Sequence, residues 1–144
     1  PILFYKGFQG LATYRAAHCL WNDNRHTMAL FFQNRASEIF GVDIHPAAKI
    51  SGGVMIDHAT GVVIGETSVI DKNVSIYQGV TLGGKGFENG DRHPKIKSGV
   101  SIFASSTILG NITIEKNAKV AAGSLVLKDV KKNTTVAGIP AKEI

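Results

Sequence analysis

The stretch IGETSVIDKNVSIYQGVTL, residues 64–82, places an aliphatic side chain at every sixth position. With two interruptions, the same spacing extends from residue 44 to residue 126. Thirteen positions share it, and all are Ile, Leu or Val: Ile44, Ile50, Ile56, Ile64, Ile70, Ile76, Leu82, Ile96, Ile102, Ile108, Ile114, Val120 and Val126. These three residue types make up 35 of the 144 residues. Because random placement would supply about three matches, the spacing indicates a structural repeat.

A second periodic feature lies three residues after many of these positions, where residues that tolerate a positive φ recur. They are Gly53, Asn73, Gly79, Gly99, Asn111, Asn117, Gly123 and Asp129. One position later the side chain is small or branched: Ala48, Val54, Ser68, Val74, Val80, Val100, Ser106, Ala118, Ser124 and Val130. Two inward side chains and one turn residue in each repeat predict a short strand followed by a corner. An α-helix does not fit, because its apolar face recurs at three and four residues.

Three such corners would close a triangular coil of about eighteen residues, and stacked coils would bury the aliphatic positions inside a solenoid. Neighbouring coils would pair their strands in parallel at about 4.8 Å. The repeat resembles that of the hexapeptide-repeat acyltransferases. This resemblance implies a mainly β fold, a left-handed parallel β-helix.

Residues 1–41 lack the six-residue spacing and carry apolar residues at helical intervals instead. We expect two helices separated by a turn at residues 22–24, with Gly41 as the stop of the second. The side chains predicted to face inward are Phe4, Phe8, Leu11, Ala12, Ala16, Cys19 and Leu20 in the first helix and Met28, Phe31, Phe32, Ala36, Ile39 and Phe40 in the second. The sequence therefore predicts a helical hairpin in residues 1–41 that covers the first coil of a β-helix in residues 42–144. We interpret Tyr14, His18, Trp21 and His26 as structural or surface residues.

Composition fits one domain-sized unit. The single Cys19 excludes an intrachain disulfide, and no apolar run long enough for a membrane span or leader is present, so we expect a cytoplasmic protein without a membrane partner. The net charge of +5 is scattered without a basic helix, which favours solubility over nucleic-acid binding. Because the chain begins at Pro1 without Met, we interpret it as part of a longer protein.

The repeat is interrupted twice, and each interruption contains a histidine. Eight residues rather than six separate Ile56 from Ile64, which places His58 in a bulge at residues 57–61. Fourteen separate Leu82 from Ile96, which predicts an extruded loop at residues 83–95 that contains His93. Since breaks in a regular repeat tend to be functional, both indicate a site.

The residue types at these breaks suit acyl transfer. His58 can act as a general base near neutral pH, a role worth about 10²–10⁴ in rate when the ring is well placed. An aspartate behind the ring would orient it, and Asp43 is one candidate. Gly83, Gly84 and Gly86 would let backbone N–H groups approach a thioester oxygen. There is no Gly-x-Ser-x-Gly motif, and we expect Cys19 on a helix face, so direct transfer fits better than a covalent intermediate.

Several motifs together resemble the serine O-acetyltransferase family. They are Asp43-Ile44-His45-Pro46-Ala47-Ala48, Asp57-His58-Ala59-Thr60-Gly61, Gly83-Gly84, Asp91-Arg92-His93-Pro94-Lys95-Ile96, the helical Tyr5-Lys6-Gly7-Phe8-Gln9 and the closing Gly138-Ile139-Pro140-Ala141. The resemblance covers essentially all 144 residues.

The resemblance implies transfer of the acetyl group of acetyl-CoA to the hydroxyl of L-serine. His58 would take the hydroxyl proton while Asp43 orients it. Substrate binding would fall to Asp57, Arg92 and His93, which would hold serine, or cysteine as a feedback inhibitor. The residues implied for acetyl-CoA, a co-substrate rather than a tightly bound cofactor, are Gly84, Ala104, Lys119 and Ala122. No metal is implied.

Assembly follows from the same resemblance. We expect a homotrimer with sites between neighbouring solenoids. A preceding helical region, carrying a further serine-binding Asp, would pair trimers into a hexamer. A C-terminal extension would dock O-acetylserine sulfhydrylase through its terminal Ile, and Ile144 is not equated with that residue.

Three alternatives remain open at this stage. A trimeric zinc protein similar to carbonic anhydrases would use His45, His58 and His93. A related transferase would accept a sugar or another amino acid. A scaffold without activity would leave both interruptions of the repeat unexplained.

Overall fold

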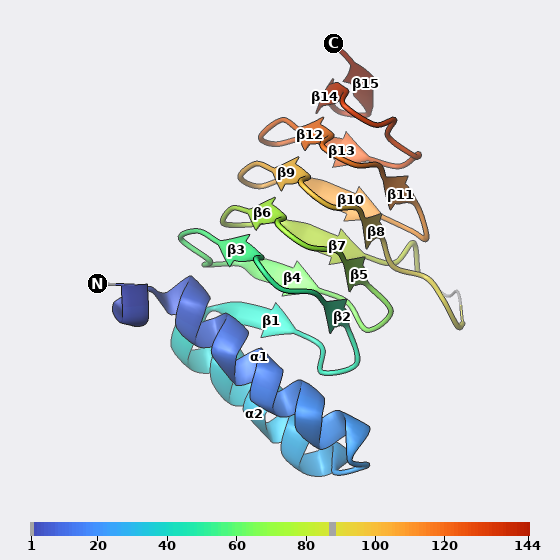
Figure 1. Cartoon of the computed structure of the whole chain (residues 1–144). Helices are drawn as coiled ribbons and strands as arrows, with labels where there is room; N and C mark the ends of the chain where they lie inside the picture. The colour runs from blue at the N-terminus through green and yellow to red at the C-terminus, as the bar shows by residue number, and fades with distance from the viewer. Residues whose placement is uncertain (1, 87–88) are drawn as a thin grey trace.

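The computed structural model describes residues 2–86 and 89–144, so residues 87 and 88 of the predicted loop lie outside the described residues. A pair of helices lies under one end of a stack of coils (Figure 1). A short 3₁₀ helix, η1 (Ile2–Phe4), precedes α1 (Lys6–Asn22) and α2 (His26–Phe40). Gly41 ends α2 in the left-handed region at φ 67°, as predicted.

The coils contribute their strands to three sheets. Sheet 1 contains β1 (Val42–Ile44), β4 (Val62–Ile64), β7 (Thr81–Gly83), β10 (Thr107–Leu109) and β13 (Leu125–Val126). Sheet 2 contains β2 (Lys49–Ile50), β5 (Val69–Ile70), β8 (Lys95–Ile96) and β11 (Thr113–Ile114). Sheet 3 contains β3 (Met55–Ile56), β6 (Ser75–Ile76), β9 (Ser101–Ile102), β12 (Lys119–Val120), β14 (Thr135–Gly138) and β15 (Ala141–Glu143). All pairings are parallel except that of β14 with β15, a hairpin that closes the described stack. The predicted parallel β-helix with a helical pair is confirmed.

Three edges join the sheets, and we name them by what they carry. The Arg92 edge leads from sheet 1 to sheet 2 and comprises residues 45–48, 65–68, 84–86, 89–94 and 110–112. The lysine edge leads from sheet 2 to sheet 3 and comprises residues 51–54, 71–74, 97–100, 115–118 and 131–134. The His58 edge leads from sheet 3 to sheet 1 and comprises residues 57–61, 77–80, 103–106 and 121–124.

The core is the set of positions that the six-residue spacing identified. All thirteen are buried, each at 6% exposure or less. They stack in register along each sheet, as Ile44 on Ile64, Ile64 on Leu82 and Leu82 on Ile108 show in sheet 1. At about 4.8 Å between coils, each aliphatic side chain contacts equivalent ones above and below.

Most predicted corner residues do adopt a positive φ: Gly53, Asn73, Gly79, Gly99, Asn117 and Gly123. Asn111 and Asp129 were predicted in the same role and do not. Gly110 takes the positive φ of 92° in place of its neighbour Asn111. Asp129 instead accepts a hydrogen bond from the backbone N–H of Thr113 at 2.8 Å. Side-chain capping replaces the left-handed corner there.

The predicted inward faces of the two helices are only partly right. Ala36 is buried, and Leu11 and Phe40 pack partly buried against the core, as predicted, but several other predicted side chains are exposed. The buried residues are Gly7, Gly10, Tyr14 and Ala17 in α1 and Ala29 and Ala36 in α2, whereas Cys19, Phe4, Phe8, Met28, Phe31 and Ile39 are exposed. The reason is the close approach of α1 to the first coil. A Cβ at Gly7 would lie 1.9 Å from the carbonyl oxygen of Ile56, so the first turn of α1 contacts the coil through a glycine rather than through Phe4 or Phe8.

Polar side chains fix the helices to the coil as well. The Tyr14 hydroxyl donates to the carbonyl of Ala48, and burial raises the pKa of Tyr14. His18 Nδ1 lies 2.6 Å from the carbonyl oxygen of Pro46. Trp21 stacks on His26 at 4.1 Å between ring centroids. These contacts agree with the structural interpretation of the four residues.

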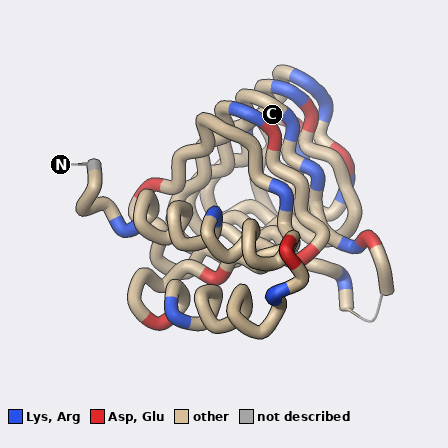
Figure 2. The backbone as a smooth tube through the Cα atoms, turned by 60° about the horizontal axis from the view of Figure 1, so that its bottom comes forward, with Lys and Arg blue, Asp and Glu red and all other residues tan. Residues whose placement is uncertain are grey.

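Charged residues lie on successive coils (Figure 2). The lysine edge carries Lys72, Lys97, Lys116, Lys131 and Lys132, interspersed with Asp71 and Glu115. Among the described residues, no helix combines the length and apolar character that crossing a membrane requires.

Truncating one member of the core column should be costly. Ile102 is fully buried, so Ile102→Ala should lower the free energy of unfolding by about 2–5 kcal/mol, measured by urea titration. Lys49→Ala on an exposed strand position should change it by less than about 0.5 kcal/mol. Equal effects of the two substitutions would contradict the assigned core.

Candidate active site

The first interruption forms a tight turn on the His58 edge. His58 and Ala59 both adopt positive φ, at 58° and 64°. The Asp57 carboxylate accepts a hydrogen bond from the backbone N–H of His58 at 2.9 Å. The imidazole itself is exposed, with 71% of the side chain accessible and Nε2 3.8 Å from Asp57 Oδ2. The turn therefore presents an accessible base beside a carboxylate.

This turn borders a pocket of about 860 Å³. Asp57 and His58 line one side of it, and η1 and the first turn of α1 line another through Phe4, Tyr5 and Lys6. The remaining wall is apolar, with Met55 on β3. A base, a carboxylate and an apolar wall thus face one space.

The second interruption projects Arg92 and His93 from the Arg92 edge. Arg92 Nη2 donates to Glu66 Oε2 at 2.7 Å, and Arg92 Nη1 donates to the carbonyl of Gly90 at 3.2 Å. The hydrogen bond from Arg92 lowers the pKa of Glu66. The guanidinium is therefore held in one orientation beside a carboxylate that stays ionised.

His93 is buried and held by Thr67. The Thr67 hydroxyl oxygen accepts the backbone N–H groups of Arg92 and His93, both at 3.0 Å, and lies 2.9 Å from His93 Nδ1. The backbone N–H of Thr67 also donates to Nδ1 at 3.2 Å. Nδ1 is thus an acceptor, which places the ring proton on Nε2. Burial, helped by the Arg92 charge, lowers the pKa of His93 and keeps the ring neutral.

A lysine fastens the base of the loop. Lys95 Nζ donates to the carbonyl oxygens of Thr67 at 2.8 Å and His93 at 2.7 Å. It also pairs with Asp91, which lowers the pKa of that carboxyl. The described part of the loop is therefore anchored where it carries Arg92 and His93.

Asp43 lies on the outer side of β1 in sheet 1 and accepts a hydrogen bond from Gln33 Nε2 at 2.7 Å. In residues 2–86 and 89–144, no hydrogen bond or ion pair joins Asp43 to His58, and Asp57 is the carboxylate in contact with the ring. The isolated chain therefore does not form the predicted pair.

The residues expected to contact acetyl-CoA divide between the edges. Gly84 lies beside the aliphatic part of Arg92, which is 3.5 Å from where a Cβ would stand. Ala104 and Ala122 lie on the His58 edge, and Lys119 is exposed on β12 of sheet 3. Only Gly84 shares the Arg92 edge.

The candidate residues thus form two groups. The carboxylate and base of Asp57 and His58 lie on one edge, and the cation and donor of Arg92 and His93 lie on another. The outer face of sheet 1, which carries Asp43, separates the two edges. A single chain therefore does not bring the two groups of candidate residues together.

The three histidines of the zinc alternative are divided in the same way. His45 and His93 belong to the Arg92 edge, and His58 does not. His45 contacts Trp21 edge to face at 5.1 Å, and burial lowers its pKa. Over the described residues, no three His, Cys, Asp or Glu side chains gather closely enough to bind a metal ion.

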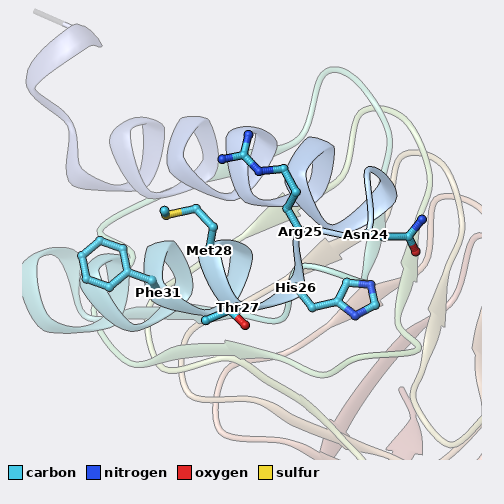
Figure 3. Close-up of a pocket in the computed structure, with 6 residues that line it drawn as sticks. All are labelled: Asn24, Arg25, His26, Thr27, Met28 and Phe31. Carbon is cyan, nitrogen blue, oxygen red and sulfur yellow. The ribbon is translucent and has the colours of Figure 1, made fainter.

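A second hollow, of about 520 Å³, lies at the turn between the helices (Figure 3). Its six lining residues are Asn24, Arg25, His26, Thr27, Met28 and Phe31. None of them is a predicted site residue.

Sequence reasoning missed the residues that support the site. Gly65 packs against the His93 ring, Glu66 accepts a hydrogen bond from Arg92, and the Thr67 hydroxyl contacts His93 Nδ1. Gln33 of α2 donates a hydrogen bond to Asp43. Aligning consecutive coils would have found the first three, because Gly65-Glu66-Thr67 occupies the corner beneath the loop. The contact between Gln33 and Asp43 could not be predicted from the six-residue spacing, because Gln33 lies on α2, outside the repeat.

No protein-family model matches the chain. The serine acetyltransferase of Haemophilus influenzae is 58% identical over 142 residues, which are 99% of this chain and 53% of that protein. The crystal structure of Neisseria gonorrhoeae serine acetyltransferase in complex with serine matches with a TM-score of 0.96 at 56% identity, over 100% of this chain and 59% of that one. The chain belongs to the serine acetyltransferase family. It spans about half the length of the curated relatives it matches.

Two further structures of serine acetyltransferases match as well. That from Brucella abortus strain S19, in complex with coenzyme A, has a TM-score of 0.97 at 54% identity, over 98% of this chain and 56% of that one. A serine acetyltransferase in complex with cysteine has a TM-score of 0.98 at 57% identity, over 100% of this chain and 56% of that one. Serine, coenzyme A and cysteine are therefore bound by serine acetyltransferases that share this fold.

Gly65 should be needed to seat His93. A Cβ at Gly65 would lie 2.1 Å from His93 Nε2, so Gly65→Ala should displace the ring and lower the free energy of unfolding by about 1–3 kcal/mol. Gly52→Ala is the matched control, because nothing lies within 4 Å of its added Cβ. Urea titration measures both, and a silent Gly65→Ala would contradict the packing.

The stability of the protein should fall on acidification. The pKa values of His45 and His93 are lowered in the folded state, so the unfolded chain binds more protons as the pH falls below 6.5. The free energy of unfolding should then decrease by up to about 1 kcal/mol per pH unit for each ring. Urea titrations between pH 7.5 and about 5 test this. His93→Asn should flatten the dependence, and an unchanged slope would refute the assignment to His93.

Proposed function

We propose that this protein transfers the acetyl group of acetyl-CoA to the hydroxyl of L-serine, giving O-acetylserine and coenzyme A. Family membership supports the reaction class, and the division of site residues between two edges supports the location. The observation that carries the proposal is that one edge presents an exposed base, His58, while another edge presents a cation, Arg92, that Glu66 holds in place.

We propose a homotrimer because neither edge is sufficient alone. A complete site would form where the His58 edge of one chain meets the Arg92 edge of the next. Repeating that contact about a threefold axis closes a ring with equivalent sites. The outer face of sheet 1 would then border the cleft, which brings Asp43 toward it.

The charged groups suit the two ends of serine. The Arg92 guanidinium, oriented by Glu66, would receive the carboxylate, and the His93 Nε2–H would add a donor. Asp57 would accept the ammonium group. Glu66 leaves part of the Arg92 fork available, since only Nη2 contacts it.

His58 would act as the general base. Its unprotonated nitrogen takes the hydroxyl proton as the serine oxygen attacks the thioester carbon. The new C–O bond forms, the C–S bond of the tetrahedral intermediate breaks, and the proton passes from the imidazolium to the thiolate of coenzyme A. A hydroxyl is too weak a nucleophile to attack without this proton removal.

Asp43 would orient the imidazolium during this step. The exposed His58 ring can rotate from Asp57 toward sheet 1, and catalytic hydrogen bonds often align only in the substrate complex. Asp43→Asn should then lower kcat, whereas Asp57→Asn should mainly raise the KM for serine.

Acetyl-CoA would lie along the cleft. Gly84 allows a backbone N–H to approach the carbonyl oxygen as charge develops there. Ala104 and Ala122 leave room on the facing edge, and the exposed Lys119 offers a cation for a phosphate of coenzyme A.

Cysteine would act at the same site, whereas further assembly would depend on segments outside it. Cysteine differs from serine only at the side-chain heteroatom, so it would compete for Asp57, Arg92 and His93. If the full protein carries a helical region before Pro1, that region would pair trimers into a hexamer, and only a C-terminal extension would bind O-acetylserine sulfhydrylase. A cytoplasmic location stays a prediction.

Serine-dependent release of coenzyme A from acetyl-CoA tests the function directly. His58→Ala should lower kcat by about 10²–10⁴ with little change in the KM for acetyl-CoA, because the ring acts on the hydroxyl proton. His26→Ala, a matched histidine at the helix turn, should keep the wild-type rate.

A panel of sugars and other amino acids as acceptors decides the acceptor class. A sugar acceptor preferred over serine would contradict the assignment. A His58→Ala variant that retains the wild-type kcat would contradict the role of His58 as the general base.

A further inference from the structure

The first turn of α1 packs directly on the turn that carries His58. A Cβ at Gly7 would lie 1.9 Å from the carbonyl oxygen of Ile56 and 3.4 Å from the Cβ of Ala59. The helix therefore approaches the Ile56 backbone as closely as a residue without a side chain permits, and it also lies near the side chain of Ala59, on the other side of His58. Lys6, the first residue of α1, lies at this contact.

The His58 turn depends on its surroundings for its shape. Two consecutive residues other than glycine, His58 and Ala59, hold positive φ, which costs free energy unless neighbouring contacts fix the backbone. Within the coil, the Thr60 N–H donates to the carbonyl of His58 at 2.8 Å, and the Val62 N–H donates to that of Ala59 at 3.0 Å. Thr60 therefore supplies one of the hydrogen bonds that hold the backbone of His58, beside that from the His58 N–H to Asp57.

Lys6 reaches the turn from outside the coils. Its ammonium donates a hydrogen bond to the Thr60 hydroxyl, 54 residues away in sequence. The Thr60 backbone carbonyl is meanwhile occupied by the N–H of Gly79 on the next coil, at 2.9 Å. Both Lys6 and His58 line the same pocket. The helix therefore contributes both a packing surface and a charged hydrogen bond to the segment that positions the base.

We propose that Lys6 is a positioning residue for His58, which acts by holding Thr60 and through it the left-handed turn. The role in catalysis rests on the proposed acetyl transfer. Lys6 itself need not touch a substrate. Removing its ammonium should leave the fold intact and let the His58 turn sample other conformations.

Lys6→Met keeps the length of the side chain and removes the charge. In the full-length protein, kcat for serine-dependent release of coenzyme A should fall about tenfold, with the KM for acetyl-CoA unchanged. Thr60→Val should give a similar loss, and the double variant should lose little more than either single variant, because both changes break one interaction. Lys6→Arg and Thr60→Ser, which retain the donor and the hydroxyl, should recover most of the rate.

Lys72→Met is the matched control, since Lys72 is exposed on the lysine edge and loses the same charge. It should keep the wild-type kcat. The unfolding temperature of all these variants should stay within about 2 °C of the wild type, because Lys6 and Thr60 are exposed. A loss of activity that follows a lowered unfolding temperature would show a merely structural role and overturn the proposal.

Amide hydrogen exchange gives a readout that does not depend on the reaction. In Lys6→Met, the amides of Thr60 and Val62 should exchange about tenfold faster, whereas that of Ser75 on β6 should not change. Unchanged exchange at Thr60 and Val62 overturns the positioning role, whatever the enzyme assay shows. Faster exchange in a protein without serine acetyltransferase activity would instead refute the proposed function alone.

Discussion

Stacking of the aliphatic column is the constraint on which the structure depends. Each coil must return an Ile, Leu or Val to the same place over its neighbour, as Ile56 does beneath Ile76 and Ile64 beneath Leu82. Residues between those positions are free to leave the coil only at a corner. The described extra residues at 57–61, 84–86 and 89–94 therefore leave the coil at corners while the flanking strands keep their register. The repeat confines chemistry to the edges, and it holds each edge rigidly relative to the others.

That confinement explains why the site is divided. His58 occupies the corner that enters sheet 1, and Arg92 and His93 occupy the corner that leaves it. Because a packed solenoid cannot bring two of its own edges together, we propose that the two groups share one substrate across a contact between chains. The hydrogen bonds that Arg92 and His93 make with Glu66 and Thr67 suit this arrangement. They hold a guanidinium and a neutral imidazole in place before any substrate arrives.

The sequence predicted the parts of the fold that arise from periodicity. The buried column and six left-handed corners follow from spacing and residue type alone. The helix faces were predicted only in part, because hydrophobicity indicates which residues are apolar but not which of them meet the coil, where α1 packs through Gly7. Both breaks in the repeat were located, since an interruption of a strict period is itself a signal. The supporting residues Gln33 and Gly65 were missed because their contacts join distant segments. The predicted link between Asp43 and His58 is not formed within the single chain and stays a prediction, because the spacing within one chain does not encode contacts between chains.

Complementation between inactive variants tests most directly whether the site is shared between chains. His58→Ala and Arg92→Ala chains, each almost inactive alone, would be unfolded together at equal concentrations and refolded. In a trimer with shared sites, each mixed ring restores one intact site, where an Arg92→Ala chain supplies His58 and its neighbour supplies Arg92. Random mixing then predicts recovery of about a quarter of the wild-type specific activity. If each chain formed its own site, the mixture would stay at the level of the two separate variants, and that result would contradict the account.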